Sequence, residues 1–203
     1  TLVLSASAQE SGDSARFGAL APRSIGPAGM SGRITALHGL AHDAETFYAG
    51  TATGGLYRTR DGGLTFESLF DEQPVSSIGA VAVHPSNPDL IWVGTGEGNP
   101  RNSSSVGDGV YRSFDGGKTW KHVGLRQTEK IHRLLLDPND QDVAYVAALG
   151  TTWGENEERG VFRTQDGGKT WESVLYVDER TGCGEMVMDP SNPKKIVAAM
   201  WEH

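Results

Sequence analysis

The sequence has 203 residues, a length that fits one ordinary globular domain with a substantial core. Its 27 glycines, 9 prolines and 37% hydrophobic residues are typical of a loop-rich globular protein and argue against intrinsic disorder. The 26 acidic residues outnumber the 18 scattered basic ones, and no 18-residue apolar run occurs, so we expect neither a nucleic-acid partner nor membrane insertion.

The first residues of the chain suggest export. Residues 1–8 are predicted to be the remnant of a bacterial-type signal peptide, because apolar residues precede Ala6-Ser7-Ala8, which has the A-x-A cleavage pattern. No initiator methionine precedes them, so we expect a truncated N-terminus, with a short N-terminal strand as the alternative interpretation. Residues 9–24 are expected to be a linker, and the protein is expected to be secreted or periplasmic. The single Cys183 cannot form an internal disulfide and is expected to be buried.

Residues 25–203 consist of successive units of short predicted strands. Each strand is a run of β-branched, aromatic and small residues bounded by turn residues. The unit at 31–70 has predicted strands over 34–37, 47–51, 56–59 and 66–70, and the unit at 77–123 has them over 78–83, 90–95, 110–113 and 120–123. The unit at 131–177 has them over 131–136, 143–148, 161–164 and 171–177, and a truncated unit at 184–203 has them over 185–188 and 196–200.

A sequence repeat punctuates these units. The pattern S/T-x-D-G-G-x-T-W/F begins at Thr59, Ser113 and Thr164, a step of 54 and then 51 residues. We expect its aspartate to accept backbone N–H groups in a tight hairpin, its glycines to take positive φ, and its aromatic residue to pack between sheets. This structural interpretation is preferred to catalysis or calcium binding. The residues assigned to it are Asp61, Gly62, Phe66, Asp115, Gly116, Trp120, Asp166, Gly167 and Trp171.

Tandem units of four antiparallel strands at this spacing predict an all-β fold, the β-propeller, in which each unit is one blade. The chain holds about three and a half blades, fewer than the roughly 4 to 8 that close a ring. We therefore expect an incomplete propeller.

The repeats resemble the Asp-box, or bacterial neuraminidase repeat, superfamily. Within it, the stretches 25–33, 107–111 and 158–162 are similar to large exported bacterial proteins described as sortilin-like or glycosyl-hydrolase-like. The superfamily includes sialidases, xyloglucan-cleaving enzymes, a photosystem assembly factor and sortilin-type receptors, so the resemblance implies the fold but no single activity. The arginine trio and Tyr/Glu pair of sialidases have no match here, and Arg33 is interpreted as a loop anchor.

Strand alternation places the Asp boxes on one face of the propeller and the irregular connections on the other, where binding residues tend to lie. Two of those connections, 96–109 and 150–160, are long and polar. Candidate catalytic acids in them are Glu97, Asp108, Glu155 and Glu158. Candidate ligand-binding residues are Arg101, Asn102, Trp153, Arg159 and His132, although packing or local ion pairs are the more ordinary roles for Trp153, His132 and the 155–159 run.

These observations favour a binding scaffold that recognises a glycan or a protein partner through its long-loop face. The alternative is a glycoside hydrolase of the Asp-box type, whose two carboxylates, about 5 to 10 Å apart, would be completed by missing blades. A third possibility is an assembly or sorting factor that reads peptides in the central channel. Catalysis by this fragment is not expected, and neither a cofactor nor a metal is, since no His/Cys/Asp cluster has metal-ligand spacing.

Overall fold

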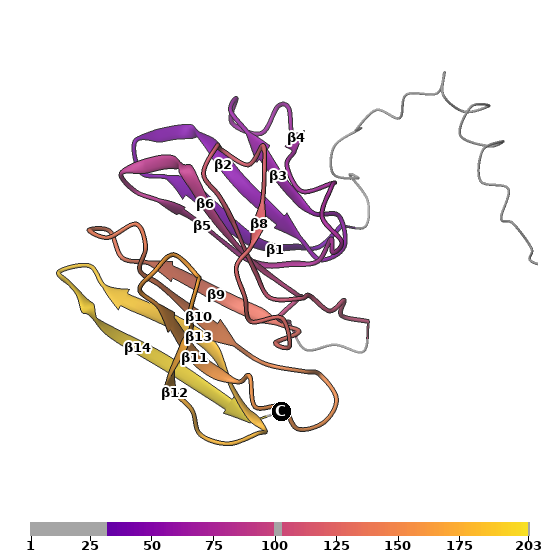
Figure 1. Ribbon diagram of the computed structural model, residues 1–203. Coiled ribbons are helices and arrows are strands. Elements are labelled where there is room, and N and C mark those ends of the chain that lie inside the picture. The colour runs from indigo at the N-terminus through magenta and orange to yellow at the C-terminus, as the bar shows by residue number, and fades with distance from the viewer. Residues whose placement is uncertain (1–31, 100–102, 203) are drawn as a thin grey trace, which may run out of the picture.

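The computed structural model describes residues 32–99 and 103–202 (Figure 1). The expected signal remnant, the linker and two of the candidate ligand-binding residues, Arg101 and Asn102, lie outside this part of the chain. All secondary-structure elements within it are β-strands, so the all-β prediction is confirmed. No helix of the described residues is long and apolar enough to cross a membrane.

The strands form four antiparallel sheets in chain order. The first holds β1 (Ile34–Leu40), β2 (Asp43–Thr51), β3 (Leu56–Thr59) and β4 (Glu67–Ser68), and the second holds β5 (Ile78–His84), β6 (Asn87–Thr95), β7 (Val110–Ser113) and β8 (Lys121–His122). The third holds β9 (Ile131–Leu136), β10 (Ala144–Ala148), β11 (Gly160–Thr164) and β12 (Glu172–Leu175). The last holds β13 (Thr181–Asp189) and β14 (Asn192–Glu202).

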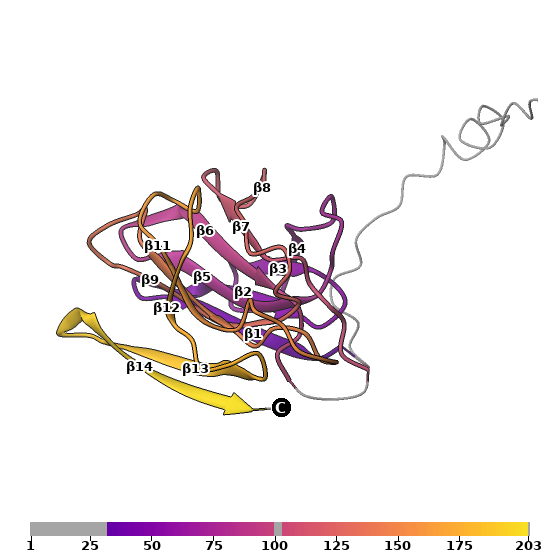
Figure 2. The same ribbon diagram turned by 60° about the horizontal axis from the view of Figure 1, so that its bottom comes forward.

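The sheets are blades of a propeller. Each is ordered as the chain runs, from an inner first strand to an outer last strand, and the first strands β1, β5, β9 and β13 contact one another in succession. Figures 1 and 2 show the sheets packed face to face around this inner row. The described residues therefore form three complete blades and two strands of a fourth, which we number one to four in chain order.

Strand lengths differ from the prediction in two ways. The inner hairpins are longer, because a two-residue turn lets pairing continue to Leu40–Asp43, His84–Asn87 and Asp189–Asn192. The outer strands β4 and β8 are shorter than predicted, because each pairs with only two residues of the preceding strand. The prediction assigned every apolar residue that follows an Asp box to the last strand, whereas in these two blades the chain departs from the sheet after two paired residues.

The Asp-box turns are held by their own side chains. In the second blade, Asp115 accepts hydrogen bonds from the Thr119 amide at 2.9 Å and the Thr119 hydroxyl at 2.6 Å, and Ser113 Oγ accepts one from the Gly117 amide. Asp61 and Asp166 accept the same bonds in their blades. The bonds to Asp115 lower its pKa to about 2, since they stabilise the ionised carboxylate. Both glycines of each box have positive φ.

The core lies between blades rather than in one centre. Ile78, Ile131 and Cys183 occupy equivalent positions of successive first strands, and each is fully buried against the preceding blade. The box tryptophans Trp120 and Trp171 pack into the same inter-blade clusters. Burial raises the pKa of the Cys183 thiol to about 11, so this cysteine is an inert packing residue, as its isolation in the sequence predicted.

Candidate functional site

The two faces of the propeller carry different connections. On one face, the Asp boxes lie beside the starts of the second strands, because Gly116 and Gly167 donate their amides to the carbonyls of Asp89 and Asp142, both at 3.0 Å. On the opposite face lie the connections between the second and third strands, namely residues 52–55, 149–159 and, of the connection in the second blade, residues 96–99 and 103–109. We refer to this second side as the long-loop face.

Glu97 begins the long loop of the second blade and is fully buried. Both its carboxylate oxygens bind the guanidinium of Arg33, from Nε at 2.7 Å and from Nη2 at 2.6 Å. Arg33 directly precedes β1, so this bidentate pair ties the first blade to the second. The hydrogen bonds that Arg33 donates to Glu97 raise the pKa of Arg33.

A second cation approaches Glu97 from the third blade. Lys130, just before β9, is buried and donates from Nζ to Ser104 Oγ at 2.7 Å. Its burial lowers its pKa, and the negative charge of Glu97 opposes that shift. Glu97 is thus tied to the first blade by its pair with Arg33 and influences the charge of Lys130 in the third blade, which is the position of a structural residue.

Asp108 ends the same loop. Its Oδ2 accepts a hydrogen bond from the Tyr111 hydroxyl at 2.8 Å, and the Arg126 guanidinium lies 3.5 Å away. Its Oδ1 is buried without a partner among the described residues. Burial and this contact with Asp108 raise the pKa of Tyr111, so the phenol stays protonated and donates. Asp108 therefore holds the end of this loop to Tyr111 and Arg126, and one of its carboxylate oxygens has no hydrogen-bond partner among the described residues.

Arg159, a candidate ligand-binding residue, points into the protein. Its side chain is fully buried and donates to the carbonyls of Leu149, Thr151 and Gly154. All three acceptors belong to the loop 149–159 itself. The guanidinium therefore holds the shape of this loop and is not presented to a ligand.

The neighbouring residues of this loop point outward. Trp153 is 78% exposed, and Glu155 forms an ion pair with Arg180 at 3.1 Å, in which both side chains are largely exposed. Glu158 accepts a hydrogen bond from the Gln127 amide at 3.0 Å, which braces the connection between the second and third blades.

The next connection, residues 176–180, completes this surface. The Asn156 amide donates to the Glu179 carbonyl at 3.0 Å and so joins the two segments. Tyr176 is half exposed, and its pKa is raised by partial burial and by the nearby carboxylates of Glu179, Glu157 and Asp178. We call the resulting surface the blade-three patch. Its members are Trp153, Glu155, Glu157, Tyr176, Asp178, Glu179 and Arg180.

His132 lies apart from this patch. It sits at a bulge in β9 and lines a cavity of about 220 Å³ with residues of β1, β5 and β13. Beside it, Arg133 Nε and Glu185 Oε1 form an ion pair at 2.7 Å. Burial lowers the pKa of His132, while Glu185 opposes that shift, so the imidazole is neutral at neutral pH.

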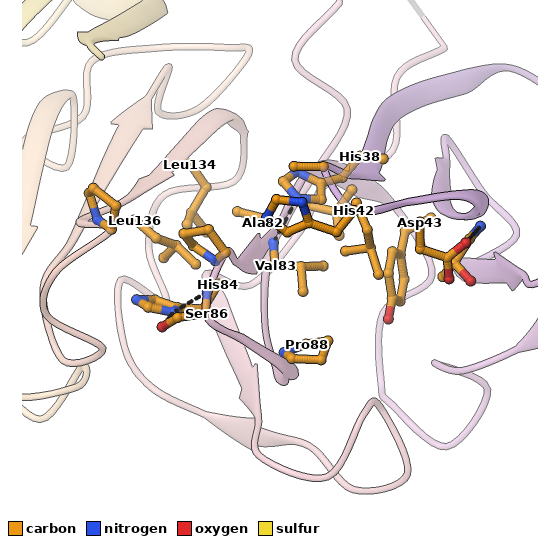
Figure 3. A pocket seen from close by; sticks show the side chains of 18 of the residues that line it. His38, His42, Asp43, Ala82, Val83, His84, Ser86, Pro88, Leu134 and Leu136 are labelled. Carbon is orange, nitrogen blue, oxygen red and sulfur yellow. Dashed lines mark hydrogen bonds between the residues drawn. The ribbon is translucent and has the colours of Figure 1, made fainter. Parts of the chain in front are cut away.

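A larger cavity, of about 890 Å³, opens on the Asp-box face, where no candidate site residue was predicted (Figure 3). The far ends of β1, β5 and β9 and their hairpins line it. His38 Nε2 accepts from the Val83 amide at 3.4 Å, and the His84 ring bonds to the Asp137 carbonyl and to Ser86. The signal that was available in the sequence is a histidine near the end of a blade's first strand, at positions 38, 42 and 84. The described residues contain no group of His, Cys, Asp and Glu that could hold a metal ion.

Three comparisons place this geometry among known proteins. The family model described as sortilin, neurotensin receptor 3 (Sortilin-Vps10) matches residues 108–202. A xyloglucanase from Paenibacillus sp is 28% identical over 175 residues, which are 78% of this chain and 16% of that enzyme. The chain thus spans less than a fifth of this curated relative.

Solved structures show the same fold. An ancestral GH74 enzyme superposes with a TM-score of 0.62 at 18% identity, covering 84% of this chain and 22% of that one. The GH74 xyloglucanase from Xanthomonas campestris gives 0.59 at 21% identity, covering 83% and 27%. The resemblance to sortilin-like and glycosyl-hydrolase-like propellers that the motifs indicated is therefore confirmed.

Proposed function

We propose that this chain is the polysaccharide-binding part of an exported glycoside hydrolase of the xyloglucanase type. In this proposal the described blades hold a glucan chain on the blade-three patch. Support comes from the curated relative, a xyloglucanase that aligns with 78% of the chain. The comparisons favour this alternative over the scaffold for a glycan or protein partner that the sequence favoured.

The observation that carries the proposal is the presentation of Trp153. Its indole is 78% exposed on a loop whose shape is fixed from inside by Arg159. An exposed aromatic face on a rigid support is suited to stacking against the apolar face of a sugar ring. The carboxylates and the guanidinium around it supply acceptors and donors for sugar hydroxyls.

The acids of these blades support binding rather than bond cleavage. Glycoside hydrolysis needs two carboxyl groups about 5 to 10 Å apart, one of them protonated. Glu97 is enclosed by Arg33, Asp108 accepts from Tyr111, and Glu158 accepts a backbone amide. Glu155 is held in its ion pair with Arg180. We therefore assign the catalytic pair to the rest of the whole protein.

Affinity electrophoresis of the 203-residue chain through gels containing xyloglucan tests the proposal. We expect xyloglucan, but not mannan, to retard the chain. In Trp153→Ala the affinity for xyloglucan should fall about tenfold or more, and the retardation should disappear. Leu64→Ala is the matched control, because Leu64 is an exposed apolar residue at an Asp-box turn on the other face.

Two results would overturn parts of the proposal. An absence of retardation by xyloglucan would remove the assigned binding role. Release of reducing sugars from xyloglucan by the same purified chain, abolished in Glu155→Gln, would show that the acids of these blades suffice for hydrolysis.

A further inference from the structure

The connection between the second and third blades runs beside the blade-three patch. Residues 123–130 join β8 to β9, and we call them the bridge segment. The Gln127 amide donates to Glu158 Oε2 at 3.0 Å, and Asn156 Nδ2 donates to the Gln127 carbonyl at 3.5 Å. These two partners are the chain neighbours of Glu157, a member of the patch. The bridge segment therefore continues the surface of the patch toward the second blade.

The other side of the bridge segment is fixed to the second blade. The Val110 amide donates to the Gly124 carbonyl at 3.0 Å, and within the segment the Thr128 amide donates to the Leu125 carbonyl at 3.2 Å. The backbone of Gly109 approaches the carbonyls of Gly124 and Leu125 so closely that a Cβ there would clash with both. Contacts with both neighbouring blades thus hold the bridge segment in place.

Leu125 has a backbone conformation that leucine rarely adopts. Its φ is +54°, and it is the one residue other than glycine with a positive φ in the part of the chain that the structure describes. This left-handed conformation is unfavourable for a residue with a Cβ, and such residues cluster at functional sites, where surrounding contacts maintain them. The Leu125 side chain is buried, whereas the Arg126 side chain is 65% exposed. The unusual turn therefore directs Arg126 to the surface.

Two exposed polar side chains follow the strained residue. Arg126 has one hydrogen-bonding partner among the described residues, Asp108, at 3.5 Å from Nη1 to Oδ2. Such a long contact with an exposed guanidinium stabilises the fold little. Gln127 is exposed, and its side-chain amide makes no hydrogen bond within the described part of the chain. A guanidinium and an amide at this place offer the donors and the acceptor that bind sugar hydroxyls.

We infer that Arg126 and Gln127 form a second subsite of the glycan site, reached by oligosaccharides that extend from the blade-three patch toward the second blade. The Arg126 guanidinium donates to hydroxyl oxygens of the distal sugar, and the Gln127 amide donates and accepts. Because the bridge segment is held from both blades, little conformational entropy is lost when these bonds form. The inference rests on the proposed function, since the blade-three patch is the first subsite.

Calorimetric titrations with xyloglucan oligosaccharides of increasing length test the inference. In the unchanged chain the affinity should rise with length and level off once both subsites are filled. Arg126→Ala should leave the affinity for the shortest oligosaccharide that binds unchanged and lower that for the longest about tenfold, while Arg126→Lys restores part of this loss. Gln127→Ala should have a smaller effect with the same length dependence. Arg60→Ala, at an exposed arginine of the first Asp box on the other face, is the control without effect.

The outcomes separate this inference from the proposed function. An equal loss at every length in Arg126→Ala, or no loss at any length, would overturn the second subsite and leave the first intact. An affinity of the unchanged chain that does not rise with length would do the same. If the unchanged chain binds no oligosaccharide, the proposed function fails and the second subsite fails with it. The urea midpoint of Arg126→Ala should equal that of the unchanged chain, and if that variant does not fold, Gln127→Ala still decides between these results.

Discussion

Replacing Glu97 by glutamine keeps the shape of the side chain but removes the charge that Arg33 and Lys130 surround. Removal of one partner from a buried ion pair typically costs about 3–5 kcal/mol, because the remaining charge stays desolvated. Arg33 is 35% exposed and can be partly hydrated, so we expect the lower end, about 3 kcal/mol. With a urea slope of about 3 kcal/mol/M for a chain of this size, the unfolding midpoint falls by about 1 M.

Urea titration followed by tryptophan fluorescence measures this loss. Glu155→Gln breaks an exposed pair with Arg180 and is the matched control, expected to cost less than about 1 kcal/mol. In a double-mutant cycle with Arg33→Met, the second substitution should cost much less once the first is present. A loss below about 1 kcal/mol for Glu97→Gln would refute the assignment of Glu97 as an inter-blade charge centre.

Three further outcomes follow from the structure. The carboxyl groups of Asp61, Asp115 and Asp166 have a pKa of about 2, below the usual 3.8, so their stabilising effect is present above pH 4 and is lost as the pH falls toward 2. The melting temperature should therefore decline between pH 5 and pH 2, and it should decline less in the triple Asp→Asn variant. Arg159→Met leaves three loop carbonyls without their hydrogen-bond donor, and we expect urea titration to show a free energy of unfolding lower by about 3 kcal/mol. Xyloglucan binding should also weaken, because the loop that carries Trp153 is no longer held in place. Unchanged stability would contradict the structural role of Arg159 in this loop. Gly96→Ala places a Cβ against the Glu129 carbonyl at a φ of +88°, so we expect the free energy of unfolding to fall by more than about 3 kcal/mol. Gly154→Ala has a φ of +97° but open space around the new Cβ, and this variant should fold. Thermal melts of both variants therefore separate the effect of the steric clash from that of backbone strain.

Much of the fold could be predicted because its signals are local. The Asp box specifies a hairpin through residues four positions apart, such as Asp115 and Thr119, and its repetition fixes the blade period. The positions of the inner strands follow from their β-branched residues. The buried state of Cys183 likewise was expected, because it is the single cysteine of the sequence and has no disulfide partner.

The candidate site was less predictable, because its contacts join distant parts of the chain. Glu97 and Arg33 are 64 positions apart, and nothing in either local sequence identifies the other as its partner. Arg159 and Glu158 are neighbours in an apparently solvated charge run, yet one is fully buried within its loop and the other binds the Gln127 amide. The cavity on the Asp-box face arises only when the first strands of successive blades lie side by side.

The most direct test of the central claim is a titration of the 203-residue chain with a xyloglucan oligosaccharide, followed by tryptophan fluorescence. Trp92 is fully buried, Trp120 and Trp171 pack between blades, and Trp201 on β14 is 43% exposed, whereas Trp153 is 78% exposed and belongs to the blade-three patch, so sugar stacking on that patch should change mainly the Trp153 emission. We predict a saturable spectral shift in the unchanged chain. Trp153→Phe and Trp153→Ala both remove the reporting indole, so their oligosaccharide affinities are compared by isothermal titration calorimetry, in which Phe should weaken binding and Ala abolish it. A shift that survives Trp153→Ala, or no shift at a saturating concentration of oligosaccharide, would contradict the claim that the blade-three patch binds the glycan.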